Sequence, residues 1–114
     1  RSAHDLFPRQ ADITLAFAWV LASAQDEQLR DGGAAMRLLD PLLRERRGPR
    51  LLDAYAPAQA APGDFAAAIR TADEAIAALR RAGPGGAAAL AGAESRRALY
   101  ARKEPFVTIP EAAP

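Results

Sequence analysis

A chain of 114 residues is long enough to bury one modest core and too short for two domains. Its 15 Lys and Arg residues nearly balance its 14 Asp and Glu residues, so the formal charge of +1 gives no long-range field to attract nucleic acid or an acidic membrane surface. The absence of cysteine excludes disulfides, thiolate catalysis and thiolate metal ligation, and leaves a cytoplasmic or a periplasmic location equally open.

Alanine is the commonest residue, and Val, Ile, Thr and the aromatic residues are too sparse to build a sheet. The composition therefore predicts an all-α fold. All but one of the basic residues are arginine, which indicates high-GC, bacterial coding. The longest apolar run, "LAFAWVLA" at 15–22, is far too short to span a bilayer, so we expect no direct membrane insertion. The chain starts with Arg1 rather than methionine, which suggests a fragment or a processed form.

The first part of the chain predicts a lead-in and two helices. Residues 1–10 contain a proline and no hydrophobic period, so we expect an extended lead-in. A helix over about 11–24 is apolar nearly all round, which is typical of a helix covered on more than one side. Asp31 is placed to cap a second helix that ends near residue 47. Pro41 lies inside this helix, where we expect a kink or a late start.

The second part predicts three more helices and a tail. A third helix covers about 50–61, despite its interior Pro57. A fourth helix lies within "PGDFAAAIRTADEAIAALRRAG", at 62–83, where an aspartate caps the start and Gly-Pro ends the helix. One face of this helix should be buried through Phe65, Ile69, Ala72, Ile76 and Leu79.

The segment "GPGG" reads as a hinge before a fifth helix over 87–101. The remaining residues, 102–114, have two interior prolines and should form an irregular tail. We expect this tail to dock through Phe106, Val107 and Ile109.

The two helix pairs repeat weakly, because Phe17-Ala18 aligns with Tyr55-Ala56, 38 residues later. The stretch "LLDAYAPAQAAPGDFAAAIRTADEAI" resembles a tetratricopeptide (TPR) repeat. The first pair, "FAWVLASAQDEQLRDGGAAMRLL", resembles a variant found near the end of bacterial TPR chains, and "RRALYARKEPF" is similar to the helix that closes such arrays. The residues that match the size pattern best are Leu52, Tyr55, Ala56, Gly63, Phe65, Ala68, Ala72 and Ala75.

This resemblance implies a short α-solenoid of about five helices over residues 11–101. Helix-turn-helix pairs at 11–47 and 50–82 would stack as antiparallel units, and the helix at 87–101 would close the array. Such a scaffold would be a non-catalytic protein-interaction module that docks a partner segment on the concave face lined by the first and third helices. The interior prolines depart from the family pattern, and so does Gln59, where a tyrosine is usual.

In the TPR comparison, the inner-groove positions are Asp12, Leu15, Trp19 and Ala22 in the first pair and Arg50, Asp53, Pro57 and Ala60 in the second. Of these, we predict that Asp12, Leu15, Trp19, Arg50 and Asp53 bind a partner. A tryptophan beside arginine and aspartate would suit a peptide anchor with charged ends. The alternative is that Trp19 packs against a preceding repeat or the N-terminal segment, and the all-round apolar character of its helix favours this alternative.

No motif indicates an enzyme, a metal site or a cofactor. Adjacent carboxylates point apart, the serines lack a base, and the sole histidine lies in the lead-in. The basic run "RERRGPR" at 44–50 suits a helix carboxyl end and has no interleaved aromatic residues, so we expect no nucleic-acid binding. The residues weighed for catalysis or metal binding are His4, Ser23, Asp26, Glu27, Asp73, Glu74 and Ser95.

Two repeats are marginal alone, because about three are needed to bury a continuous core. The apolar first helix therefore predicts a covering neighbour, either a peptide segment or another subunit of an oligomer or hetero-complex. Three hypotheses stay open: a recognition module, an accessory subunit permanently fixed in a larger and possibly membrane-bound assembly through the first helix and the tail, and the carboxyl end of a longer enzyme or membrane protein. The sequence does not name the partner.

Overall fold

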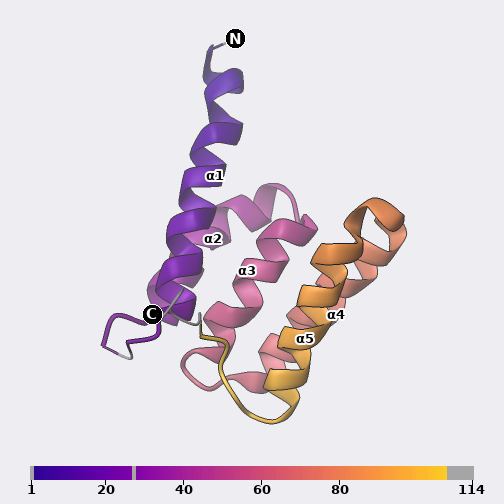
Figure 1. Ribbon diagram of the computed structural model, residues 1–114. Coiled ribbons are helices and arrows are strands. Elements are labelled where there is room, and N and C mark those ends of the chain that lie inside the picture. The colour runs from indigo at the N-terminus through magenta and orange to yellow at the C-terminus, as the bar shows by residue number, and fades with distance from the viewer. Residues whose placement is uncertain (1, 27, 108–114) are drawn as a thin grey trace, which may run out of the picture.

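The computed structural model describes the backbone of residues 2–26 and 28–107, and the side chains from residue 12 onward within these ranges (Figure 1). These parts of the chain contain helices, turns and loops but no strand, so the all-α prediction is confirmed. The helices are α1 (Ser2–Ser23), α2 (Gly32–Glu45), α3 (Pro49–Ala60), α4 (Phe65–Ala82) and α5 (Ala87–Ala101), with a short 3₁₀ turn, η1 (Pro84–Gly86), before α5.

The helices stack in chain order. α1 packs against α2 and α3, and α3 packs in turn against α4 and α5, so α3 lies at the centre of the fold (Figure 1). α1, α3 and α5 follow one another on one side of the stack, and α2 and α4 lie behind them. The result is a repeat-like arrangement of two helix pairs, α1 with α2 and α3 with α4, which α5 closes.

Local signals in the sequence set the ends of α2 and α4. The Asp31 carboxylate accepts a hydrogen bond from the Ala34 amide at 3.0 Å, and the Asp64 carboxylate accepts one from the Ala67 amide at 3.2 Å. Each bond satisfies a donor that the first helical turn leaves without an intrahelical partner. Gly83 ends α4 with a φ of 89°, a conformation that other residues rarely adopt.

α1, α2 and α3 each contain a proline. α1 begins at Ser2, so the extended lead-in predicted for residues 1–10 is wrong, and the helix runs through Pro8. α2 begins directly after its cap and runs through Pro41, which excludes the late start, one of the two alternatives expected there. α3 likewise contains Pro57. A proline deletes only one backbone hydrogen bond, and packing of the flanking residues can offset that loss.

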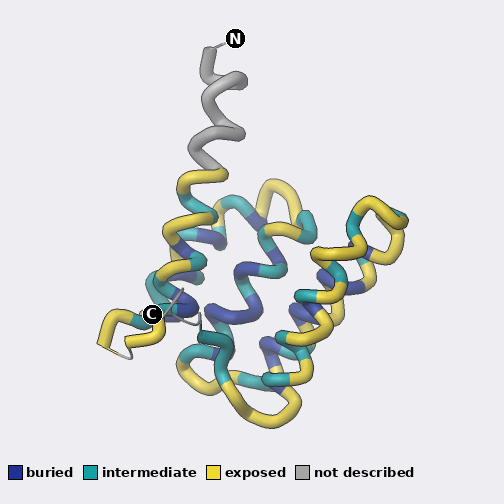
Figure 2. The backbone as a smooth tube through the Cα atoms, in the orientation of Figure 1, coloured by how far each residue is buried: buried dark blue, intermediate teal, exposed yellow. Residues whose placement is uncertain are grey.

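Alanine is the commonest residue among those that are buried. Figure 2 shows that the buried stretches lie where neighbouring helices meet. One cluster lies where α1, α2 and α3 meet, and a second joins α3 and α4 to Tyr100 of α5. Small side chains let helix backbones approach closely without leaving a gap. The buried alanines that serve this purpose are Ala18, Ala22, Ala35, Ala54, Ala56, Ala58, Ala60, Ala67, Ala68, Ala72, Ala75 and Ala93.

The closest approach involves Gly32, the first residue of α2. A Cβ atom on Gly32 would lie 2.2 Å from the Ala58 carbonyl oxygen and 2.8 Å from the Pro62 side chain. The carbonyl belongs to the α3 backbone, so it cannot rotate away as a flexible side chain would. A glycine is therefore required for α2 to begin against the end of α3.

We expect Gly32→Ala to lower the free energy of unfolding by about 1–3 kcal/mol, because the added methyl overpacks this contact. Gly33→Ala is the matched control: its Cβ would meet only side-chain atoms at 3.5 and 3.6 Å. Gly33→Ala should be neutral or stabilising by up to about 1 kcal/mol, since alanine favours helix. Urea unfolding followed by circular dichroism measures both, and equal effects would show that the α2–α3 contact is not tight.

Candidate functional site

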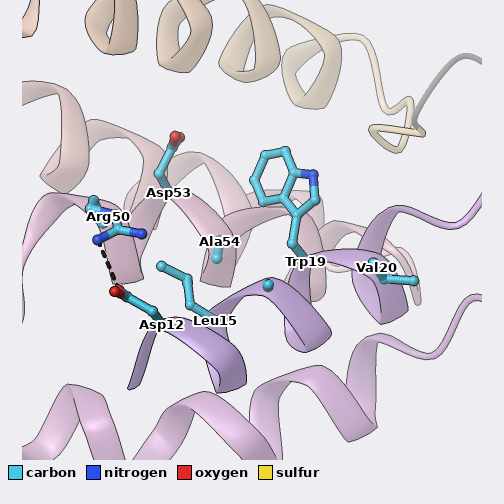
Figure 3. Close-up of a pocket in the computed structure, with 8 residues that line it drawn as sticks. Asp12, Leu15, Trp19, Val20, Arg50, Asp53 and Ala54 are labelled. Atoms are coloured by element: carbon cyan, nitrogen blue, oxygen red, sulfur yellow. Dashed lines mark hydrogen bonds and ion pairs between the residues drawn. The ribbon is translucent and has the colours of Figure 1, made fainter. Parts of the chain in front are cut away.

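A shallow hollow of about 490 Å³ lies between α1 and α3 and opens to solvent (Figure 3). α1 and α3 provide the whole lining. All five residues that were predicted to bind a partner line this hollow, together with three that were not predicted. The other expected groove positions are wrong, because Ala22, Pro57 and Ala60 are buried between the helices. The lining consists of Asp12, Leu15, Trp19, Arg50 and Asp53, together with Ala16, Val20 and Ala54.

The repeat explains why these residues meet. Asp12 and Arg50 are 38 residues apart, which is the repeat spacing, so they occupy equivalent positions on α1 and α3. Their side chains form an ion pair at 3.1 Å on one side of the hollow (Figure 3). Both side chains are more than half exposed, and such a pair contributes only about 0–1 kcal/mol to stability. The pair therefore serves better as an accessible polar edge than as a structural clamp.

Trp19 lies at the other side of the hollow and is half-buried. Its ring centroid is 5.3 Å from that of Phe106, and the two rings are tilted by 55°. The Arg96 guanidinium carbon lies 5.2 Å from the Trp19 ring and 5.4 Å from the Phe106 ring. These distances suit both an edge-to-face aromatic pair and a cation–π contact. Trp19, Arg96 and Phe106 thus form a three-way contact, which we call the aromatic triad.

Asp53 fixes the arginine of the aromatic triad. Its carboxylate accepts a hydrogen bond from Arg96 at 2.5 Å, and the side chains of Arg96 and Asp53 are only 16% and 23% exposed. In Figure 3, Asp53 and Trp19 project from their helices toward the same side, where α5 and the tail pass. Charge-assisted bonds are stronger where water is partly excluded. Asp53 therefore links α3 to α5 at the wall of the hollow.

Two polar groups near this link have no hydrogen-bond partner among the described residues: Arg96 Nε and the Tyr100 hydroxyl. Tyr100 is only 1% exposed. Burial raises the pKa of Tyr100 well above its usual range, because a phenolate would lose its hydration; Arg96 opposes this shift and Asp53 adds to it. Tyr100 is therefore a neutral donor held in an apolar cluster without an acceptor.

Trp19 is covered from a direction that the sequence did not indicate. The expected cover was a preceding repeat or the N-terminal segment, whereas Phe106 of the C-terminal tail provides it here. Phe106 also packs against the cluster around Tyr100, and Val107 is half-buried, while Ile109 lies outside the described residues. Docking of the tail was expected from the sequence, but its contact with Trp19 was not, and Arg96 was not among the predicted site residues.

The basic run at 44–50 provides partners for carboxylates of this chain. Arg47 donates two hydrogen bonds of 2.8 Å to Glu74 of α4, which raise the pKa of Arg47 and lower the pKa of Glu74. Arg50 pairs with Asp12, as described above. Asp73, weighed as a catalytic carboxylate, binds Arg97. Arg47, Arg50 and Arg97 therefore form ion pairs with carboxylates of the same chain.

The remaining sequence candidates were carboxylates, serines and a histidine weighed for catalysis or metal binding. Within the described residues, no three His, Cys, Asp or Glu side chains lie close enough to hold a metal ion. The side chains of His4 and Glu27 are outside the described part. The same part of the chain contains no helix that is long and apolar enough to cross a bilayer.

Comparisons with protein-family models, curated proteins and solved structures find no match to this chain. The resemblance to TPR repeats therefore stays a prediction, and the geometry of the hollow and the aromatic triad is the basis for any functional argument.

The two tyrosines should respond oppositely to loss of the hydroxyl. Tyr100→Phe removes a buried donor without an acceptor, so we expect the free energy of unfolding to stay level or rise by about 1 kcal/mol. Tyr55→Phe removes a 2.8 Å hydrogen bond to Asp40 and should lower the free energy of unfolding by about 1 kcal/mol. Urea unfolding measures both variants; marked destabilisation by Tyr100→Phe would show that its hydroxyl is bonded in solution.

Proposed function

We propose that this chain is a non-catalytic, TPR-like interaction module that binds an extended segment of a partner protein in the hollow between α1 and α3. The observation that carries the proposal is the convergence of Asp12, Leu15, Trp19, Arg50 and Asp53 on one solvent-open hollow. Repeat scaffolds commonly bind partners on such inner surfaces, because successive helices present equivalent positions side by side.

The lining suits a peptide ligand. Leu15, Ala16 and Ala54 provide an apolar floor, on which an aliphatic or aromatic side chain would lose contact with water. Asp12 and Arg50 offer an acceptor and donors at the exposed edge, where they can bond to a peptide backbone or a charged side chain. The hollow thus combines an apolar centre with a polar rim, as protein interfaces generally do. We propose recognition by shape, without a cofactor.

The test is selection of binding peptides from an unbiased displayed library on the intact chain. Ala16→Arg should reduce the affinity of selected peptides at least about tenfold, because Ala16 lines the hollow and the larger side chain fills it. Ala77→Arg, at an exposed position of α4, is the matched control and should leave affinity unchanged. Failure to select any peptide, or equal binding to both variants, would contradict the proposal.

A separate observation favours a second function, that of an accessory subunit held permanently in an assembly. Ile13, Phe17 and Val20 follow helical spacing on α1 and are 63%, 58% and 59% exposed. Among the described helices, α1 packs only against α2 and α3, and these helices leave the apolar stripe exposed. Exposed apolar stripes of this kind commonly mark interfaces. We propose assembly through α1 as the alternative to a free recognition module.

Under this alternative, light scattering across a concentration series should show a mass above that of the monomer. Phe17→Lys should shift the chain to monomer, because a charge in an apolar interface costs several kcal/mol. Ala77→Lys is the control and should behave as the original chain does. A wild-type chain that stays monomeric at all concentrations would contradict self-assembly through α1.

A further inference from the structure

The chain ahead of Phe106 turns back sharply after α5. The Lys103 amide donates to the Tyr100 carbonyl oxygen and the Glu104 amide donates to the Leu99 carbonyl oxygen, both at 2.9 Å. Lys103 has a φ of 60°, in the left-handed region that glycine adopts far more easily than lysine. This turn sends residues 105–107 back toward α1 and α3 (Figure 1).

The surface that receives Phe106 is built by the helices. Trp19 belongs to α1 and packs against the cluster that α1, α2 and α3 share, and Arg96 belongs to α5 and is held by Asp53 of α3. Their positions therefore do not depend on the tail. A flat aromatic ring that contacts both Trp19 and Arg96 gains dispersion and cation–π attraction together.

The tail itself is held lightly. Among the described residues, no backbone hydrogen bond ties residues 105–107 to the helices, and all three residues are half-buried. Ring contacts of Phe106 are the specific interactions that hold it. The hollow also begins at Trp19 and extends to Asp12 and Arg50, so a longer segment seated on Trp19 could continue along it.

We propose that Trp19 and Arg96 form a binding subsite for an aromatic residue of a partner segment, and that the segment Pro105–Phe106–Val107 occupies this subsite as an intramolecular competitor. The ligand is an extended segment with an aromatic residue, which displaces Phe106 and continues into the hollow. This inference rests on the proposed function and adds the chemistry of the anchor residue.

The test uses the 114-residue chain and a synthetic peptide with the sequence of residues 102–114. Trp19 is the sole tryptophan, so its emission reports directly on the subsite. In Phe106→Ala the subsite is vacated, and Trp19 emission should shift to the red. The peptide should bind Phe106→Ala at least about tenfold more tightly than the original chain and reverse that shift. A peptide with alanine in place of its phenylalanine should bind neither protein.

Variants at Lys103 test displacement without touching the subsite. Lys103→Gly makes the left-handed turn easier to form, so Phe106 should occupy the subsite more firmly and peptide binding should weaken. Lys103→Val makes the turn harder to form, so peptide binding should strengthen. We expect their affinities to differ about fivefold or more. These variants remain informative if Phe106→Ala fails to fold.

Equal peptide affinity for Lys103→Gly and Lys103→Val, or no peptide binding to any variant, would overturn the proposal and make Phe106 a fixed part of the core. The proposed function is tested separately, by the effect of Ala16→Arg on the affinity of selected library peptides. Selected library peptides could lose affinity for Ala16→Arg and yet neither compete with the tail peptide nor carry an aromatic residue. That result would support the interaction module and contradict the aromatic subsite.

Discussion

Close packing of α3 against its neighbours is the constraint on which the rest of the structure depends. α3 contacts α1, α2, α4 and α5, and its buried face is made largely of alanine. Gly32 has no side chain at all where α2 begins against α3. Because small residues contribute little apolar area each, the fold depends on many close contacts rather than on a few large side chains. Any enlargement of this face would separate the helices that define the hollow.

Ion pairs connect neighbouring helices in the described part of the chain, and most of them lie at the exposed surface. Asp53 and Arg96 are the half-buried pair that joins α3 to α5, and this pair also positions one wall of the aromatic triad. This pair therefore contributes both to the packing of the helices and to the geometry of the hollow. The ion pair between Asp12 and Arg50, which is well exposed, can change partner with little effect on folding. The hollow thus has a rigid wall beside Trp19 and an adaptable edge beside Arg50.

The sequence predicted what depends on local signals. Asp31 and Asp64 specify helix starts, Gly83 specifies an end, and the all-α fold follows from composition and periodicity. The prediction was wrong for residues 1–10, which were expected to be extended because they contain a proline. α1 instead runs through Pro8, because a single proline can be accommodated within a helix.

For the candidate site, the repeat comparison placed Asp12 and Arg50 at equivalent groove positions. In the structure the two residues pair, because equivalent positions of stacked helices lie side by side. No comparable pattern in the sequence pointed to Arg96 and Phe106. Arg96 meets Asp53 across 43 residues. Phe106 reaches Trp19 only because the chain reverses at Lys103, a lysine in a conformation that would normally indicate glycine. Such contacts depend on tertiary geometry, which neither periodicity nor propensity encodes.

A tethered Phe106 would also determine what kind of partner can bind. Exchange of one aromatic ring for another on Trp19 and Arg96 yields little net free energy, because the incoming ring makes the same kinds of interaction as the ring that leaves. The tail also holds its phenylalanine at a high effective concentration, on the millimolar scale typical of short linkers. A partner with an aromatic residue alone would therefore compete poorly. A partner that also fills the hollow between Leu15 and Ala54 makes interactions there that the described part of the tail does not make, so the hollow, rather than the anchor, would decide specificity.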